Sequence, residues 1–225
     1  MTETRPTLPR ELNAFELRVL GTLIEKSLTT PEQYPLSLNA TKVGCNQKTS
    51  REPVVNYEER TVGGAFRDLI ELKLVREVYP PERGAMRYEH RLANVLDLRA
   101  PAVALLGVLM LRGAQTLGEL RQNCQRMHAF DSIDHVQDAL DRLATREPPL
   151  ILQLARAPGQ REERYCHLLG GHDAALKQAA SSPISYAAAL PPARVNNDEV
   201  AELRREMEEL KARVVELEAF AASLQ

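Results

Sequence analysis

The stretch LRVLGTLI, residues 17–24, recurs 86 residues later as VALLGVLM, residues 103–110. In each copy the apolar residues are spaced three and four apart, a pattern that predicts a helix with one buried face. The sequence therefore predicts an internal duplication. The matching apolar positions are Leu17, Leu20, Leu23 and Ile24 in the first copy and Val103, Leu106, Leu109 and Met110 in the second.

Two further pairs of predicted helices extend the duplication. Ser37 precedes a short helix that matches the one preceded by Thr116, at an offset of 79 residues. A helix predicted over residues 58–73 matches one that begins after Ser132, at an offset of 74. Two short strand patterns follow each group of three helices. Three helices closed by a hairpin are typical of a winged helix-turn-helix, so we predict a mainly α fold with small β-hairpins (α+β), built from tandem winged helix-turn-helix domains.

The predicted domains are residues 1–95 and residues 96–180. Residues 181–198 are rich in Ser, Ala and Pro, which indicates a linker, and residues 199–225 are predicted to form a coiled-coil helix. In the first hairpin, apolar and charged residues alternate, as in a half-buried strand. The apolar positions of that strand are Met86, Tyr88, His90 and Leu92.

Several residues mark where the helices begin and end. Thr30 followed by Pro31 predicts a side-chain cap with proline at the first helical position. Thr116 with Glu119 three residues later predicts a capping box. Other helix ends are predicted at Ser37, Gly113 and Ser132.

The C-terminal segment predicts self-association. Its apolar residues repeat at spacings of three and four, as in a coiled-coil seam, and the flanking charges suit a parallel homodimer. The alternative is an amphipathic helix that folds back on its own domains, because three and a half heptads are marginally stable alone. The seam that we predict to make the dimer contains Val200, Leu203, Met207, Leu210, Val214 and Leu217.

The overall charge is close to neutral, at -2 with a pI near 6.2. Residues 1–95 carry 14 Lys and Arg against 13 Asp and Glu, so that any DNA contact must come from a local basic patch. Three widely spaced cysteines indicate no disulfide framework. No apolar run is long enough to span a membrane, and the N-terminus lacks a signal-peptide core, so we expect a cytoplasmic protein.

The residues EKSLTTPEQYPLSLNA (25–40) and CNQKTSREPV (45–54) resemble a signature of the bacterial YceH family, an uncharacterised group with two winged-helix domains. The resemblance extends to about Gly171 and implies the tandem fold, but it implies no activity. One departure is Thr41, where the family is expected to have leucine. The matching position of the second repeat is a leucine, Leu120.

The first repeat contains the basic and polar residues that could contact DNA. In a winged helix, the third helix enters the major groove and the wing meets the DNA backbone. A loop with Asn and Ser side chains before Pro53 could instead serve only to satisfy backbone groups. The predicted DNA-binding residues are Lys48, Thr49, Ser50, Arg51, Arg60, Arg67, Arg83 and Arg87.

The third helix of the second repeat carries Asp134, Asp138 and Asp141, which phosphates would repel. We therefore expect this repeat to contact protein. The leading hypothesis is a DNA-associated, regulator-like protein, and the competing one is a protein-interaction scaffold that binds no DNA.

No catalytic motif, metal site or cofactor is predicted. Cys124 and His128 are spaced like metal ligands, but Cys124 lies on a buried stripe. Cys166 and His167 are adjacent in a strand and point to opposite faces. We expect no enzymatic activity.

Overall fold

The computed structural model describes residues 6–79, 84–156, 162–181 and 213. The chain divides into two units, Met1–Ser182 and Pro183–Gln225, and every described residue except Arg213 belongs to the first. The predicted linker, apart from its first residue, lies outside the described residues. So do the predicted dimer residues Val200, Leu203, Met207, Leu210, Val214 and Leu217.

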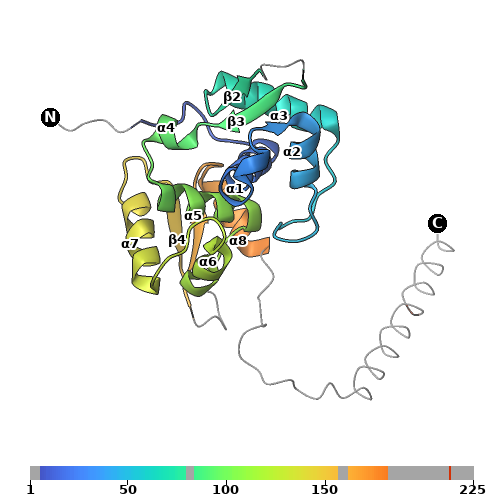
Figure 1. Cartoon of the computed structure of the whole chain (residues 1–225). Coiled ribbons are helices and arrows are strands. Elements are labelled where there is room, and N and C mark those ends of the chain that lie inside the picture. Colours follow the sequence, from blue (N-terminus) through green and yellow to red (C-terminus); the bar gives the residue numbers. More distant parts are fainter. Residues whose placement is uncertain (1–5, 80–83, 157–161, 182–212, 214–225) are drawn as a thin grey trace, which may run out of the picture. The chain divides into compact units, whose positions relative to one another are not determined.

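The first repeat combines helices with a three-stranded antiparallel sheet (Figure 1). The strand order is β1-β3-β2, which makes β3 the central strand. Leu36 pairs with Tyr88, and Val75 pairs with His90. The elements are α1 (Ala14–Thr29), the 3-10 helix η1 (Pro31–Gln33), β1 (Leu36–Ser37), α2 (Leu38–Cys45), α3 (Glu59–Glu71), β2 (Val75–Val78) and β3 (Arg87–His90).

The second repeat has the same order of elements. Its sheet contains two antiparallel strands, and a single bridge between Gln115 and Tyr165 stands where β1 pairs with β3 in the first repeat. Its elements are α4 (Leu92–Leu96), which links the repeats, α5 (Ala100–Arg112), α6 (Leu117–Cys124), α7 (Ile133–Ala144), β4 (Ile151–Leu154), β5 (Arg164–His167) and the C-terminal α8 (His172–Ser181).

The structure confirms most of the helix ends predicted from the sequence. Thr116 and Glu119 form the predicted capping box, with the Thr116 hydroxyl accepting from the backbone of Glu119. Gly113 ends α5 with φ at 78°. The remaining predicted caps are Ser37, which accepts from Ala40, and Ser132, which accepts from His135.

Two other local predictions, at Thr30 and Leu92, were wrong, whereas the departure at Thr41 is accommodated. Thr30 makes no side-chain cap, because its hydroxyl donates back to the carbonyl of Lys26 and only a 3-10 turn follows. Leu92 was predicted to end a strand but begins α4. Thr41 is fully buried, and its hydroxyl is satisfied by the carbonyl of Ser37 at 3.0 Å.

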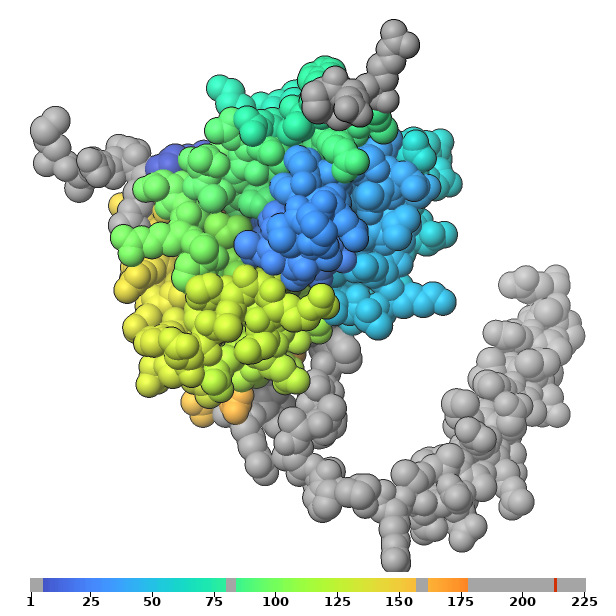
Figure 2. Space-filling model, viewed as in Figure 1, coloured from blue at the N-terminus to red at the C-terminus, as the bar shows by residue number. Residues whose placement is uncertain are grey.

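The two repeats share one hydrophobic core. A single cluster of buried residues extends from Leu12 to Leu169, and α1 packs directly on α5. The first-repeat and second-repeat surfaces adjoin in the space-filling view (Figure 2). The boundary predicted after residue 95 therefore separates two repeats within one compact unit, Met1–Ser182.

Glycines allow α1 and α5 to approach closely. A Cβ at Gly107 would lie 2.8 Å from a methyl of Ile24, and a Cβ at Gly21 would lie 3.2 Å from the Met110 Cβ. Gly21 and Gly107 are related by the offset of 86, and so are Ile24 and Met110. Each contact therefore has a counterpart with the repeats exchanged, as in a two-fold symmetric interface.

None of the helices among the described residues combines the length and hydropathy that a membrane span requires.

Candidate nucleic-acid interface

Helix α3 is held against the central strand by its apolar face. Val62, Phe66 and Leu69 are spaced four and three residues apart and are buried. The ring of Phe66 stacks on that of Tyr88 in β3, with centroids 3.8 Å apart and an interplanar angle of 11°. This packing fixes the orientation of the helix, so that its opposite side faces solvent.

The solvent side of α3 carries two arginines with two glycines between them. Arg60, Gly63, Gly64 and Arg67 follow helical spacing. The side chain of Arg60 is 86% exposed and pairs with Glu58 at 2.9 Å, while Arg67 makes no ion pair with any described residue. A Cβ at Gly63 would meet nothing within 4 Å, so that packing inside this chain does not require glycine there.

The corresponding helix of the second repeat has acidic residues at the positions of the two α3 arginines, although both helices carry a small net negative charge. The offset of 74 that relates α3 to α7 places Asp134 at the position of Arg60 and Asp141 at the position of Arg67. Both aspartates are exposed. The two third helices therefore share a fold and a buried stripe, but only α3 presents cations at these two positions.

The hairpin contributes Arg87, at the start of β3. Its side chain is exposed, and Nη1 donates to the carbonyl of Pro35 at 2.8 Å, which leaves its other donors directed to solvent. Arg76 and Glu89 form an ion pair across β2 and β3. Arg83, which the sequence predicts to bind DNA, lies outside the described residues.

The loop between α2 and α3 closes on a pair of hydrogen bonds. The side-chain amide of Asn46 donates to the carbonyl of Tyr57 at 2.9 Å and accepts from its N–H at 2.7 Å. The loop is also tied to the second repeat, because Arg112 donates to the Ser50 hydroxyl at 2.7 Å. Lys48 and Thr49 remain exposed at its tip.

Arg51 is buried beneath this loop, with 4% of the residue exposed. Its five N–H donors are all used within the protein, including two short contacts to the carboxylate of Glu25. Burial opposes the ionisation of Glu25, but the hydrogen bonds from Arg51 bring the pKa of that carboxyl below its ordinary value. The other acceptors are the carbonyls of Gly44 and Ser50 and the side chain of Gln47.

The burial of Arg51 contradicts its prediction as a DNA-binding residue. A guanidinium with every donor satisfied inside the protein has none to offer a phosphate, so that Arg51 is a structural residue. The remaining predicted residues are divided among three places: the loop tip with Lys48 and Thr49, the exposed side of α3 with Arg60 and Arg67, and the hairpin with Arg87. Ser50 lies between, bonded to Arg112 and with φ at 60°.

A second buried arginine, Arg18 on α1, was missed at the level of sequence. It donates to the carbonyl of Pro53 at 2.6 Å and holds the far end of the loop. Burial lowers the pKa of Arg18. The signal in the sequence is a polar stripe, Arg18, Thr22 and Glu25, beside the apolar stripe of α1.

The three cysteines are buried away from the candidate DNA-binding residues. Cys45, Cys124 and Cys166 are buried free thiols, and burial raises the pKa of Cys124 to about 12 and that of Cys166 to about 11. Within the described part of the chain, no three His, Cys, Asp or Glu side chains are grouped as metal ligands.

The chain is similar to proteins of several bacteria. It is 49% identical over 226 residues to a UPF0502 protein of Xanthomonas axonopodis pv. citri, covering 100% of this chain and 96% of that protein. It is 46% identical to UPF0502 proteins of Burkholderia multivorans (96% and 88% covered) and of Methylibium petroleiphilum (92% and 85%). The profile of a family described as "Protein of unknown function, DUF480" matches residues 12–160. The chain therefore belongs to the DUF480 family.

Proposed function

We propose that this protein binds double-stranded DNA through its first repeat, which acts as a winged helix-turn-helix with α3 as the recognition helix and the β2–β3 hairpin as the wing. The order of elements and the β1-β3-β2 sheet support this assignment, because a winged helix places its third helix beside a small antiparallel sheet in this way. The second repeat has the same order but serves a structural role beside it.

The observation that carries the proposal is the exposed side of α3. A glycine inside a helix costs about 1 kcal/mol relative to alanine, and no described residue lies within 4 Å of a Cβ at Gly63 to offset that cost. Helix backbone without side chains can approach the floor of a groove, while Arg60 and Arg67 on either side reach phosphates or base edges. Aspartates at both matching positions of α7 limit this function to the first repeat.

Fluorescence polarisation with labelled genomic duplexes tests the proposal. Binding should weaken steeply as salt rises, and Arg67→Gln should weaken it about 10-fold and lower the slope of log K against log salt by about 1. Arg60→Gln should behave in the same way. Lys177→Gln, which removes an exposed charge on α8, is the matched control and should leave binding unchanged.

A second variant separates the function of α3 from its stability. Gly63→Ala should raise the free energy of unfolding by up to about 1 kcal/mol, because alanine favours the helix and its Cβ meets nothing within 4 Å. The same change should weaken DNA binding, since the methyl group lies where the duplex would approach. A more stable variant with unchanged affinity would contradict the role assigned to this side of α3.

The second candidate function is a protein-interaction scaffold, favoured by the acidic surface of α7. Asp134, Asp138 and Asp141 are exposed there, and Ile133 is 46% exposed. If polarisation at low salt shows no binding, or binding that does not change with salt or with Arg67→Gln, the scaffold replaces DNA binding as the better account.

We also infer from the heptad pattern that residues 199–225 form a parallel two-stranded coiled coil. Two copies of the first repeat on one dimer would raise the effective concentration at paired sites, which suits a domain of nearly neutral charge. Leu210→Pro should give a monomer with both repeats folded. Light scattering that shows the unchanged full-length protein as a monomer at micromolar concentration would exclude this assembly.

A further inference from the structure

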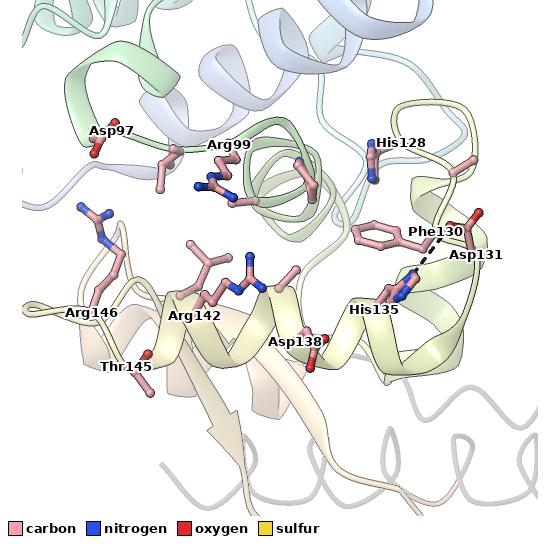
Figure 3. A pocket seen from close by; sticks show the side chains of 16 residues that line it. Asp97, Arg99, His128, Phe130, Asp131, His135, Asp138, Arg142, Thr145 and Arg146 are labelled. Carbon is pink, nitrogen blue, oxygen red and sulfur yellow. Dashed lines mark ion pairs between the residues drawn. The ribbon is translucent and has the colours of Figure 1, made fainter.

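A cavity of about 580 Å³ lies in the second repeat, away from the elements assigned to DNA (Figure 3). It is bounded by α7, by the N-terminal end of α5 and by the loop that contains His128 and Phe130. Its volume is in the range of small-molecule sites. The proposed DNA contacts do not use it.

One side of the cavity is apolar. Phe130 is buried, and its ring is held edge-on by His128 with centroids 4.7 Å apart. Leu143 contributes from α7. The other apolar residues that line the cavity are Leu98, Pro101, Ala102, Ala129 and Ala139. A ligand with an apolar body would therefore bury it against a preformed surface.

Two arginines reach into the same space from facing elements. In Figure 3, Arg99 enters from the start of α5 and Arg142 from α7. Neither guanidinium has a hydrogen-bond or ion-pair partner among the described residues, whereas Arg146 at the end of the cavity donates to the carbonyl of Pro6. Both arginines are exposed, and an anion that enters the space between them would meet two cations at once.

The lining contains three acidic residues, Asp97, Asp131 and Asp138, and within the described part of the chain none of them forms an ion pair with Arg99 or Arg142. Asp131 pairs with His135 at 3.7 Å, at the opposite end of α7 from Arg146. The side chain of Asp138 points away from the space that Arg99 and Arg142 enter (Figure 3). The N-terminus of α5 adds to the positive potential, because its N-cap residue, Arg99, provides no side-chain acceptor for the first N–H groups.

We propose that this cavity binds a small organic carboxylate. Its carboxylate group is held between Arg99 and Arg142, whose planar guanidinium groups match the two oxygens, and its apolar body contacts Phe130 and Leu143. The apolar side of the cavity selects such a molecule over inorganic phosphate, which has no group to place there. This site is independent of DNA binding and of the oligomeric state.

Saturation-transfer NMR on the full-length protein tests the proposal with benzoate and 3-methylbutanoate, each compared with its primary amide. The carboxylates should give transfer signals, and the amides should bind at least about 10-fold more weakly, because a neutral amide loses the charge-assisted bonds. Arg99→Gln and Arg142→Gln should each reduce carboxylate binding. Arg126→Gln is the matched control, because this exposed arginine lies outside the lining.

A further variant tests the apolar side without changing charge. Ala139→Leu should fill part of the cavity and reduce the binding of both carboxylates. The proposal is overturned if neither carboxylate binds at millimolar concentration, if the amides bind equally well, or if Arg99→Gln and Arg142→Gln bind like the unchanged protein. Displacement of the carboxylates by equimolar inorganic phosphate would also overturn the proposal, because that result would show a site for simple anions.

Discussion

Two arginines of the first repeat, Arg51 and Arg60, have the same side chain and opposite environments. Arg51 is buried with every donor used by the protein, while Arg60 extends into solvent from α3. Both lie in polar stretches of sequence, so that composition alone assigned them the same role. The difference arises from Glu25, which lies 26 residues before Arg51 and meets it only once α1 and the loop have packed.

The first prediction at this scale concerns the Arg51–Glu25 pair. Arg51→Ala should lower the free energy of unfolding by on the order of 3 kcal/mol, because it leaves the Glu25 carboxylate poorly solvated and without its main partner. Urea denaturation followed by circular dichroism measures the change. Lys48→Ala, on the exposed tip of the same loop, is the control and should stay within about 0.5 kcal/mol. Equal losses from both variants would contradict the structural role of Arg51.

A second prediction concerns pH and two histidines at matching positions of the two hairpins, the half-buried His90 and the buried His167. Burial lowers the pKa of His90 and of His167 to about 4, and neither ring nitrogen of His167 has a hydrogen-bond partner among the described residues. Between about pH 4 and 6.5 the unfolded chain therefore binds more protons than the folded protein, and stability should fall as the pH is lowered through this window.

The histidine prediction is tested with His167→Leu, which should flatten this pH dependence without loss of stability at pH 7. Between pH 6.5 and 4, the free energy of unfolding of the unchanged protein should fall by on the order of 3 kcal/mol more than that of His167→Leu. His172→Gln, on the exposed start of α8, is the control. Loss of the stabilisation from Glu25 occurs at lower pH, because the pKa of that carboxyl is already below its ordinary value in the folded protein. An unchanged pH profile in His167→Leu would remove His167 as its source.

At the scale of elements, the sequence predicted the helix ends that depend on residues close together in the chain. The helices capped by Thr116 and Ser132 begin where predicted, because a cap and its acceptors lie within three residues of each other. Three elements were not predicted: β1, α4 and α8. The two residues of β1 are a strand only because β3 lies beside them, and α4 is a single turn that depends on burial of Leu92 and Leu96.

The candidate site was predicted less completely than the fold, because more of its features depend on contacts between residues far apart in the sequence. Periodicity identified α3 and its buried stripe, and therefore indicated that Arg60 and Arg67 face solvent. It gave no indication that a Cβ at Gly63 would meet nothing within 4 Å, since the neighbours of a glycine appear only in three dimensions. The cavity beside α7 was also missed, because its lining comes from segments separated by more than 40 residues.

The prediction for the α1–α5 contact uses glycine substitutions. Gly107→Ala should lower the free energy of unfolding by about 1–3 kcal/mol, because its Cβ would lie 2.8 Å from a branched methyl of Ile24 and 2.9 Å from Met127. Gly118→Ala, in α6 with nothing within 4 Å, is the control and should not destabilise the protein. Thermal denaturation measures both. A stable Gly107→Ala variant would show that the helices are free to separate.

At the scale of the whole molecule, the shared core predicts a single unfolding transition. The main hydrophobic cluster of Met1–Ser182 contains buried residues of both repeats, so that unfolding of one repeat would expose buried surface of the other. Calorimetric and van't Hoff enthalpies should agree, and far-ultraviolet circular dichroism and tyrosine fluorescence should give coincident curves. Two separated transitions would mean that the repeats are independent domains.

The reciprocal contact between α1 and α5 has a consequence for how this protein could change over time. In a homodimer every substitution appears on both sides of the symmetry axis at once, so that the two surfaces stay identical. Here the two sides are encoded separately in one chain, so that a substitution on one side leaves the other unchanged. The reciprocal glycine contacts can therefore coexist with arginines on α3 and aspartates at the matching positions of α7.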